Sequence, residues 1–173
     1  MNNDIPLRID PVLFAKQERQ FSGELVVADL PRIVEITPNP ATQIVVTMSF
    51  SKSSLHYPLV KGTIDGEVVQ ICQRCLRHTN VAINSQFELL LVSGAAVESA
   101  SQEGHEVFEY NEQHIDTVDF LEQEIILALP IVPKHSLLEE CSASAQKWIK
   151  NKEHVPADQP KENPFAKLKD LNI

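Results

Sequence analysis

Residues 59–75 read LVKGTIDGEVVQICQRC, and this stretch decides the fold. Its two halves, Leu59–Ile64 and Glu67–Ile71, are typical of β-strands, and Asp65-Gly66 between them predicts a tight hairpin turn. The stretch ends on a CxxC motif, Cys72-Gln73-Arg74-Cys75, after which another strand-like run begins. We therefore expect the motif at the tip of a hairpin, as in half of a zinc ribbon, and not at the strand-to-helix turn of a thioredoxin-type site.

Strand patterns continue on both sides of this stretch. Residues 44–50 alternate between large apolar and smaller side chains, and residues 81–91 place apolar side chains at the odd positions. The connections are too short for parallel crossovers, so residues 41–92 are predicted to form an antiparallel meander. No helix-length pattern interrupts the meander, which argues against a doubly wound nucleotide-binding fold.

Helices are predicted before and after the meander. Asp10-Pro11 is a good helix start, and we expect a short helix that ends near Gln20. A longer amphipathic helix is predicted over residues 118–129, capped by Asp116 or Thr117 and stopped by Pro130. The predicted fold class is α+β: an antiparallel β meander or barrel-like sheet packed by one main helix, with short N- and C-terminal helices.

The chain is predicted to divide into a domain and a tail. Residues 1–142 are expected to form a single α+β domain in which residues 93–116 are an acidic, mobile loop. Residues 143–173 are a lysine-bearing tail, where Trp148 and Ile149 are predicted to lie on a short helix. Asn163-Pro164 then starts a last amphipathic helical turn. Whether this turn docks on its own domain or binds something else is left open.

The charge of the chain is concentrated in one segment. The net charge is −9, and residues 78–133 contain ten Asp or Glu and no Lys or Arg. An acidic face of this kind attracts a basic partner, such as a ribosomal protein, whereas the more common explanation of such a face is a solubilising surface. No signal-peptide pattern and no apolar stretch of membrane-spanning length is present, and the three cysteines favour a reducing compartment. We expect a cytoplasmic protein with no membrane partner.

The CxxC motif is the candidate metal site. A structural zinc ion needs four ligands, and the distant residues able to complete the set are His135 (or His78) and Cys141. The predicted ligand set is thus Cys72, Cys75, His135 and Cys141, with zinc as the one candidate cofactor. The alternative is a pair of reduced thiols on a surface hairpin with no metal and no cofactor.

Candidate partner-binding residues lie at the hairpin tip and in the tail. Arg74 and Arg77 lie at the hairpin tip and could meet a phosphate or a carboxylate. In the last amphipathic turn, Phe165 lies on one side and Lys167 and Lys169 on the other. No phosphate-binding glycine loop, nucleophile elbow or HExxH motif occurs, so we do not expect an enzyme and name no catalytic residue.

Four blocks of the sequence resemble the YceD family, the large ribosomal RNA subunit accumulation proteins. They are Pro6–Pro11, Cys72–Cys75, Glu122–Pro133 and Asn163–Ala166. The resemblance implies a role in the synthesis, processing or stability of 23S rRNA, and a link to a basic large-subunit ribosomal protein. Some relatives carry a fuller second cysteine cluster, of which this chain retains His135 and Cys141.

Our leading hypothesis is therefore a non-catalytic factor in large-subunit assembly. Its partner is expected to be a basic large-subunit ribosomal protein or the pre-50S particle, with direct contact to rRNA left open. Two alternatives come from other classes of protein: an rRNA-processing enzyme, and a zinc-stabilised structural or binding module.

Overall fold

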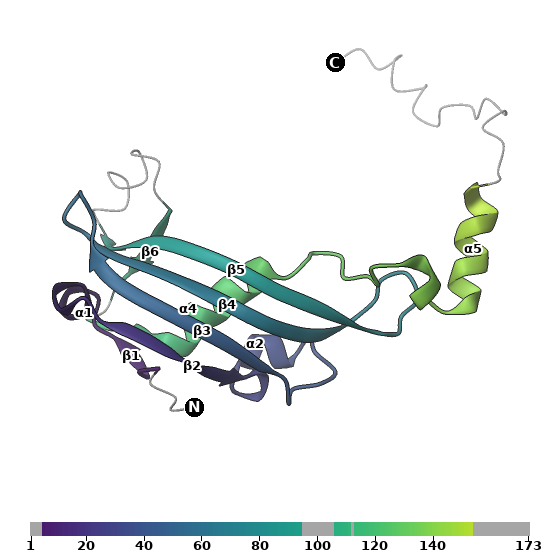
Figure 1. The fold of residues 1–173 in the computed structure, drawn as a ribbon, viewed down its shortest axis with the longest axis horizontal. Coiled ribbons are helices and arrows are strands. Elements are labelled where there is room, and N and C mark those ends of the chain that lie inside the picture. Colours follow the sequence, from purple (N-terminus) through teal and green to yellow (C-terminus); the bar gives the residue numbers. More distant parts are fainter. Residues whose placement is uncertain (1–4, 95–105, 112, 154–173) are drawn as a thin grey trace, which may run out of the picture.

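A five-stranded sheet with one long helix across a face forms the body of the protein (Figure 1). The structure is a computed structural model that describes residues 5–94, 106–111 and 113–153. The strand order is β2-β3-β4-β5-β6, and β1 and β7 pair separately as a two-stranded ribbon. The elements are β1 Arg8–Ile9, α1 Pro11–Gln17, β2 Gln20–Val26, η1 Val27–Asp29, α2 Pro31–Val34, β3 Gln43–Lys52, β4 Pro58–Ile71, β5 His78–Ser93, β6 Val107–Tyr110, β7 Ile115–Asp116, α4 Thr117–Ala128, η3 Leu138–Glu140 and α5 Ala143–Glu153.

The predicted α+β fold class is confirmed. Strands β2 to β5 are antiparallel neighbours, as the short connections required, whereas β6 adds to the edge of β5 in parallel. The sheet is open, with β2 and β6 at its two edges. Helix α4 begins and ends close to the predicted positions, and its N-cap Asp116 accepts the backbone N–H of Asp119 at 3.0 Å.

The predicted hairpin turn at Asp65-Gly66 is wrong. These residues lie inside β4, a continuous strand of 14 residues, where Gly66 is opposite both Ile44 of β3 and Ile83 of β5. A Cβ atom on Gly66 would stand 3.1 Å from the Cα of Ile44 and 3.1 Å from the carbonyl oxygen of Gln43. Glycine is therefore used here for the close approach of a neighbouring strand and not for a turn.

The core lies between the sheet and α4. Phe120 of α4 is fully buried and its ring meets those of Phe87 and Phe108 edge-on, at centroid distances of 5.7 and 5.0 Å. A second, smaller cluster buries Leu90 and Val92 of β5 on the opposite side of the sheet. On the side that faces α4, the buried side chains alternate along each strand. They include Ile44, Val46, Met48 and Phe50 of β3, Val60, Ile64 and Val68 of β4, and Ile83, Phe87, Leu89 and Leu91 of β5.

Several local elements differ from the predictions. Helix α1 ends at Gln17, earlier than predicted, because Glu18 adopts the left-handed conformation with φ 50°. Pro31, Pro38 and Pro40 predict strand edge and loop for the stretch that they interrupt. The structure instead places the short helix α2 at Pro31–Val34, directly after η1. Strands β6 and β7 lie within the stretch 93–116 that was expected to be a loop, and residues 95–105 and 112 of that stretch are outside the described residues.

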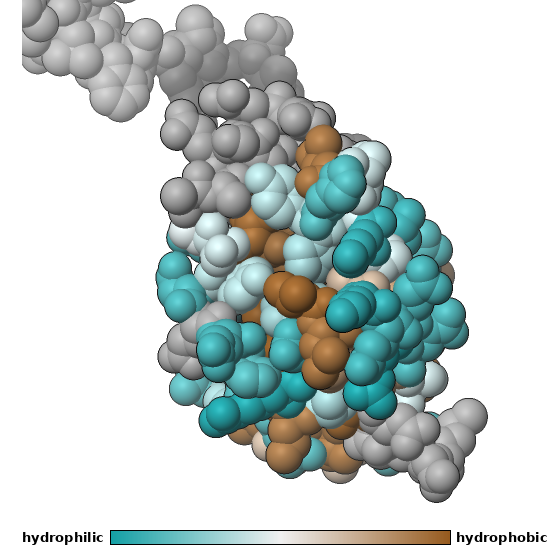
Figure 2. All heavy atoms as spheres, turned by 90° about the vertical axis from the view of Figure 1, so that its left-hand side faces the viewer, coloured by the Kyte–Doolittle hydropathy of each residue, from teal (hydrophilic) through white to brown (hydrophobic). Residues whose placement is uncertain are grey.

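The two ends of the molecule carry different features. The end that carries α1 presents polar side chains with apolar ones between them (Figure 2). Val12 and Leu13 of α1 are exposed. At the other end, α5 lies beyond the turn between β4 and β5 (Figure 1). Helix α5 contains Trp148 and Ile149, as predicted, whereas the predicted turn after Asn163 lies outside the described residues. No helix in the described part of the chain is long and apolar enough to cross a membrane.

Candidate metal centre

Four candidate metal ligands meet at the turn between β4 and β5. Cys72 and Cys75 belong to this turn, and the chain that follows α4 returns to it, where the backbone N–H of Gln73 donates to the carbonyl of Pro133 at 2.8 Å. This return places His135 and Cys141 beside the two turn cysteines. The thiol sulfurs and the imidazole nitrogen of the four residues all lie within 4.8 Å of one another. The structure thus brings together the complete ligand set that the sequence predicted.

The spacing of these atoms suits a tetrahedral zinc ion. The Nδ1 atom of His135 lies 3.5 Å from the Sγ of Cys75 and 3.6 Å from the Sγ of Cys141. Zinc bonds of about 2.3 Å to sulfur and about 2.05 Å to nitrogen place neighbouring ligand atoms about 3.6 Å apart in a tetrahedron. The donor set of three thiols and one imidazole is also one that zinc prefers. The residues present therefore fit the ion.

His135 is oriented for metal binding by a backbone contact. Its Nε2 atom lies 3.0 Å from the carbonyl oxygen of His78. Since a carbonyl only accepts, Nε2 carries the proton and the lone pair of Nδ1 faces the three sulfurs. His78, which we considered as an alternative ligand, thus takes part through its backbone, and its exposed side chain is not in the cluster.

The turn lowers the pKa of the Cys72 thiol. Burial alone raises the pKa of the Cys72 thiol, but the backbone N–H groups of His135, Arg74 and Cys75 hydrogen-bond the sulfur and bring its pKa down to about 5. The backbone N–H of Leu76 closes the turn on the carbonyl of Cys72 at 2.8 Å, with Leu76 in the left-handed conformation at φ 58°. This conformation is unfavourable for leucine, so the turn is held by its surroundings.

Cys141 shows why the cluster suits a cation. Burial and the neighbouring thiols of Cys75 and Cys72 raise the pKa of Cys141 to about 11. Three sulfurs this close cannot all be negative without a positive charge between them. A zinc ion held by Cys72, Cys75, His135 and Cys141 would supply that charge.

Arg74 faces inward and fastens the returning chain. Its guanidinium donates to the backbone carbonyls of His135 and, at 3.4 Å, Leu137. Its Nε atom is buried and has no hydrogen-bond partner among the described residues. Of the predicted partner-binding residues, Arg74 therefore holds the segment with His135 against the turn, whereas Arg77 is exposed. Phe165, Lys167 and Lys169 lie outside the described residues.

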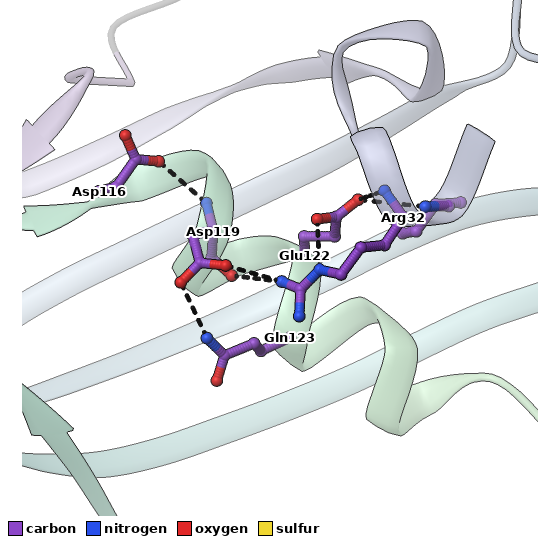
Figure 3. A network of polar contacts seen from close by, with 6 residues as sticks. Arg32, Asp116, Asp119, Glu122 and Gln123 are labelled. Atoms are coloured by element: carbon purple, nitrogen blue, oxygen red, sulfur yellow. Dashed lines mark hydrogen bonds and ion pairs between the residues drawn. The ribbon is translucent and has the colours of Figure 1, made fainter. Parts of the chain in front are cut away.

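A second polar cluster was not predicted. Glu122 of α4 is 2% exposed and pairs with Arg32 of α2, which also contacts Asp119 (Figure 3). A signal for it exists in the sequence, because helical spacing places Glu122 among the apolar residues Val118, Leu121 and Ile125. The Arg32–Glu122 pair is a structural contact between α2 and α4.

The comparisons with known proteins agree on one family. The family model described as "Large ribosomal RNA subunit accumulation protein YceD" matches residues 60–172, a range that includes all four ligands. The Large ribosomal RNA subunit accumulation protein YceD of Haemophilus influenzae is 32% identical over 169 residues, which cover 96% of this chain and 95% of that protein. No solved structure matches the chain. The chain therefore belongs to the YceD family of large ribosomal RNA subunit accumulation proteins.

Proposed function

We propose that this protein is a non-catalytic factor in the accumulation of 23S rRNA and the assembly of the large ribosomal subunit, acting in the cytoplasm. The observation that carries the proposal is the similarity to the YceD protein of H. influenzae, which extends over 96% of this chain. The name of that relative gives the process and not the mechanism. The geometry of the candidate metal centre supports the non-catalytic mechanism that we propose.

The ligand set supports a structural role for the metal. Cys72, Cys75, His135 and Cys141 supply four protein ligands to one point. A catalytic zinc site instead keeps one position open for water or substrate. We therefore propose that one zinc ion per chain holds the segment after α4 on the turn between β4 and β5, and that the centre stabilises a binding module.

An acidic surface of the sheet supports a basic protein partner. Asp65 and Glu67 of β4 and Glu88 of β5 are exposed on the face opposite to α4. On this face, Lys61 is the cation paired with Glu88, at 3.0 Å. A basic large-subunit ribosomal protein, free or within the pre-50S particle, is complementary to such a surface.

The proposed role is tested by depletion and complementation. Cells that lack the protein are expected to show a lower ratio of 23S to 16S rRNA and fewer large subunits in a sucrose gradient, and the wild-type chain should restore both. Incubation of purified protein with precursor rRNA should leave the RNA intact. Normal 23S levels after depletion would contradict the proposed process, and RNA cleavage by the purified protein would instead support the rRNA-processing enzyme.

The acidic surface is tested by a charge-matched pair of variants. Replacing Asp65, Glu67 and Glu88 by Asn, Gln and Gln should weaken the capture of a basic large-subunit protein from a low-salt extract, and wild-type capture should fall as salt rises. The control replaces three exposed acids elsewhere on the described surface, namely Glu18, Asp29 and Glu35. Equal capture by both triple variants would exclude the sheet face as the binding surface.

A further inference from the structure

The end of the molecule that carries the metal centre presents exposed cations. Arg77 follows the β4–β5 turn, Lys134 lies on the returning segment, and Lys147 and Lys150 lie on α5. All four side chains are exposed, and none of them forms an ion pair with another described residue. This charge contrasts with the acidic face of the sheet, so the protein has a positive end and a negative face.

Helix α5 has an inner and an outer side. Ala145, Gln146 and Ile149 are half-buried, and the amide of Gln146 donates to the carbonyl oxygens of Glu139 at 2.9 Å and Cys141 at 2.7 Å. Lys147 and Lys150, one turn apart, are on the exposed side. The carbonyl of Cys141, one of the four candidate ligands, therefore holds the first turns of α5 next to the candidate metal centre.

A large aromatic side chain accompanies the cations. Trp148 follows Lys147 directly and is 60% exposed. An indole ring next to lysines on a supported helix provides the two parts of a site for single-stranded nucleic acid: cations for phosphates and a flat surface for a base. Two acids, Glu139 and Glu140, lie in η3, just before α5. The carboxylate of Glu140 already accepts a hydrogen bond from the backbone N–H of Leu137 at 3.2 Å.

We propose that Arg77, Lys134, Lys147, Lys150 and Trp148 form a binding surface for single-stranded RNA. The cations contact the phosphate backbone and the Trp148 ring stacks on an unpaired base. The assignment of this RNA to rRNA rests on the proposed function, whereas the surface itself rests on the described contacts. The acidic sheet face repels the rest of the nucleic acid, and it thereby directs the RNA to this end of the molecule.

The sole tryptophan of the chain provides a direct readout. Titration of the full-length protein with a single-stranded RNA of about 16 nucleotides should quench the fluorescence of Trp148. With labelled RNA in an anisotropy assay, Trp148→Ala should bind roughly 5- to 100-fold more weakly, whereas Trp148→Phe should retain most of the affinity because it keeps an aromatic ring. Circular dichroism checks that each variant remains folded.

The lysines are tested through the salt dependence of binding. The double variant Lys147→Gln/Lys150→Gln should lower the slope of log affinity against log salt by about 1.4, because each phosphate that a lysine neutralises accounts for about 0.7. The matched control is Lys16→Gln/Lys52→Gln, two exposed lysines on α1 and at the end of β3. This control changes the net charge equally and should leave the slope unchanged.

Three outcomes would overturn the RNA surface. They are the absence of RNA binding, equal slopes for both double variants, and equal or stronger quenching of Trp148 by poly-glutamate or by vesicles of phosphatidylglycerol and phosphatidylcholine. The last outcome would assign the surface to an acidic protein or a membrane. If RNA binding fails while 23S levels still depend on the protein, the surface is wrong and the proposed function stands.

Discussion

The carboxylate of Glu122 accepts hydrogen bonds from both the backbone and the guanidinium of Arg32. Its Oε1 atom lies 2.6 Å from the backbone nitrogen of Arg32 and its Oε2 atom 2.7 Å from Nε, while Ile33 donates a further backbone N–H at 3.1 Å (Figure 3). Helix α2 begins after Leu30, which has no side chain able to cap it. Glu122 of α4 therefore provides the cap of α2 from a distant part of the chain.

We expect Glu122→Ala to be strongly destabilising. The side chain of Glu122 is 3% exposed, so its removal leaves backbone N–H groups and part of a guanidinium without partners. Because the Arg32 side chain is itself 45% exposed, the loss comes mainly from the backbone N–H groups of Arg32 and Ile33, and it should be about 2–3 kcal/mol of unfolding free energy. Urea denaturation measures the loss, and Glu122→Gln, which keeps a neutral acceptor, should lose less.

The matched control for Glu122 is an exposed ion pair. Glu88 and Lys61 lie 3.0 Å apart on the outer face of the sheet, with side chains 56% and 53% exposed. Glu88→Ala should cost less than about 1 kcal/mol, because water screens such pairs. Similar losses for Glu88→Ala and Glu122→Ala would contradict the buried role of Glu122.

The Arg32–Glu122 pair shows where prediction from sequence ends. The amphipathic pattern predicted α4, and the position of Glu122 on its apolar side indicated a buried partner. Arg32 could not be identified as that partner, because it is 90 residues away and lies in a segment expected to be a loop. Local patterns thus predicted the elements, whereas the contact between α2 and α4 depends on how the whole chain folds.

The cluster of four candidate ligands was predictable for a different reason. The CxxC spacing is local, and His135 and Cys141 were the distant residues available to complete four ligands. The inward position of Arg74 was not predictable, because exposed and buried arginines look alike in a sequence. The false turn at Asp65-Gly66 arose from a strong local signal that the pairing of β4 with both β3 and β5 overrides.

Two glycine substitutions distinguish a continuous β4 from a hairpin. A Cβ atom on Gly62 would stand 2.2 Å from Cζ of Phe87 and 2.5 Å from the backbone oxygen of Thr47. Gly62→Ala should therefore lose about 2 kcal/mol or more. Gly66→Ala meets its nearest atoms at 3.1 Å and should lose less. The reverse ranking in thermal or urea denaturation would support a turn at Gly66, where alanine is disfavoured at positive φ.

Removal of His135 should remove the metal. The wild-type chain, purified without chelator, is expected to contain about one zinc ion, and His135→Ala well below that. A zinc concentration a thousand times its Kd contributes about 4 kcal/mol of stability. In a chain of this size, that contribution corresponds to a Tm rise of roughly 8–16 °C. A strong chelator should abolish this rise in the wild type and leave the Tm of His135→Ala unchanged.

The control for His135 is an exposed histidine outside the cluster. His114 lies next to β7, and His114→Ala should keep both the zinc content and the response to chelator. Equal zinc content in wild type and His135→Ala would show that the four residues do not bind the ion together. In that case the cysteines would be reduced thiols, the alternative left open by the sequence.

We expect the replacement of Glu124 by Gln to give a gain in stability that depends on pH. Burial, and then the negative charge of Glu106, raise the pKa of the Glu124 carboxyl in the folded protein above its ordinary value of about 4.3. The folded state therefore binds the proton more tightly than the unfolded state, and stability falls as the pH rises from about 4.3 through the folded pKa. Glu124→Gln removes this loss, so at pH 7 the variant should be more stable by roughly 0.5 kcal/mol, a value kept small by solvent screening.

The gain from Glu124→Gln should shrink as the pH falls through about 4.3 and disappear near about pH 3, because the carboxyl is then protonated in both states. Urea denaturation across this pH range provides the comparison, with Glu109→Gln as the control. Glu109 is exposed on β6, so its replacement changes the net charge equally and should alter stability by less than about 0.5 kcal/mol at every pH. A gain for Glu124→Gln that is constant with pH, or larger in acid, would mean that repulsion and burial of the charged carboxylate are not its cause.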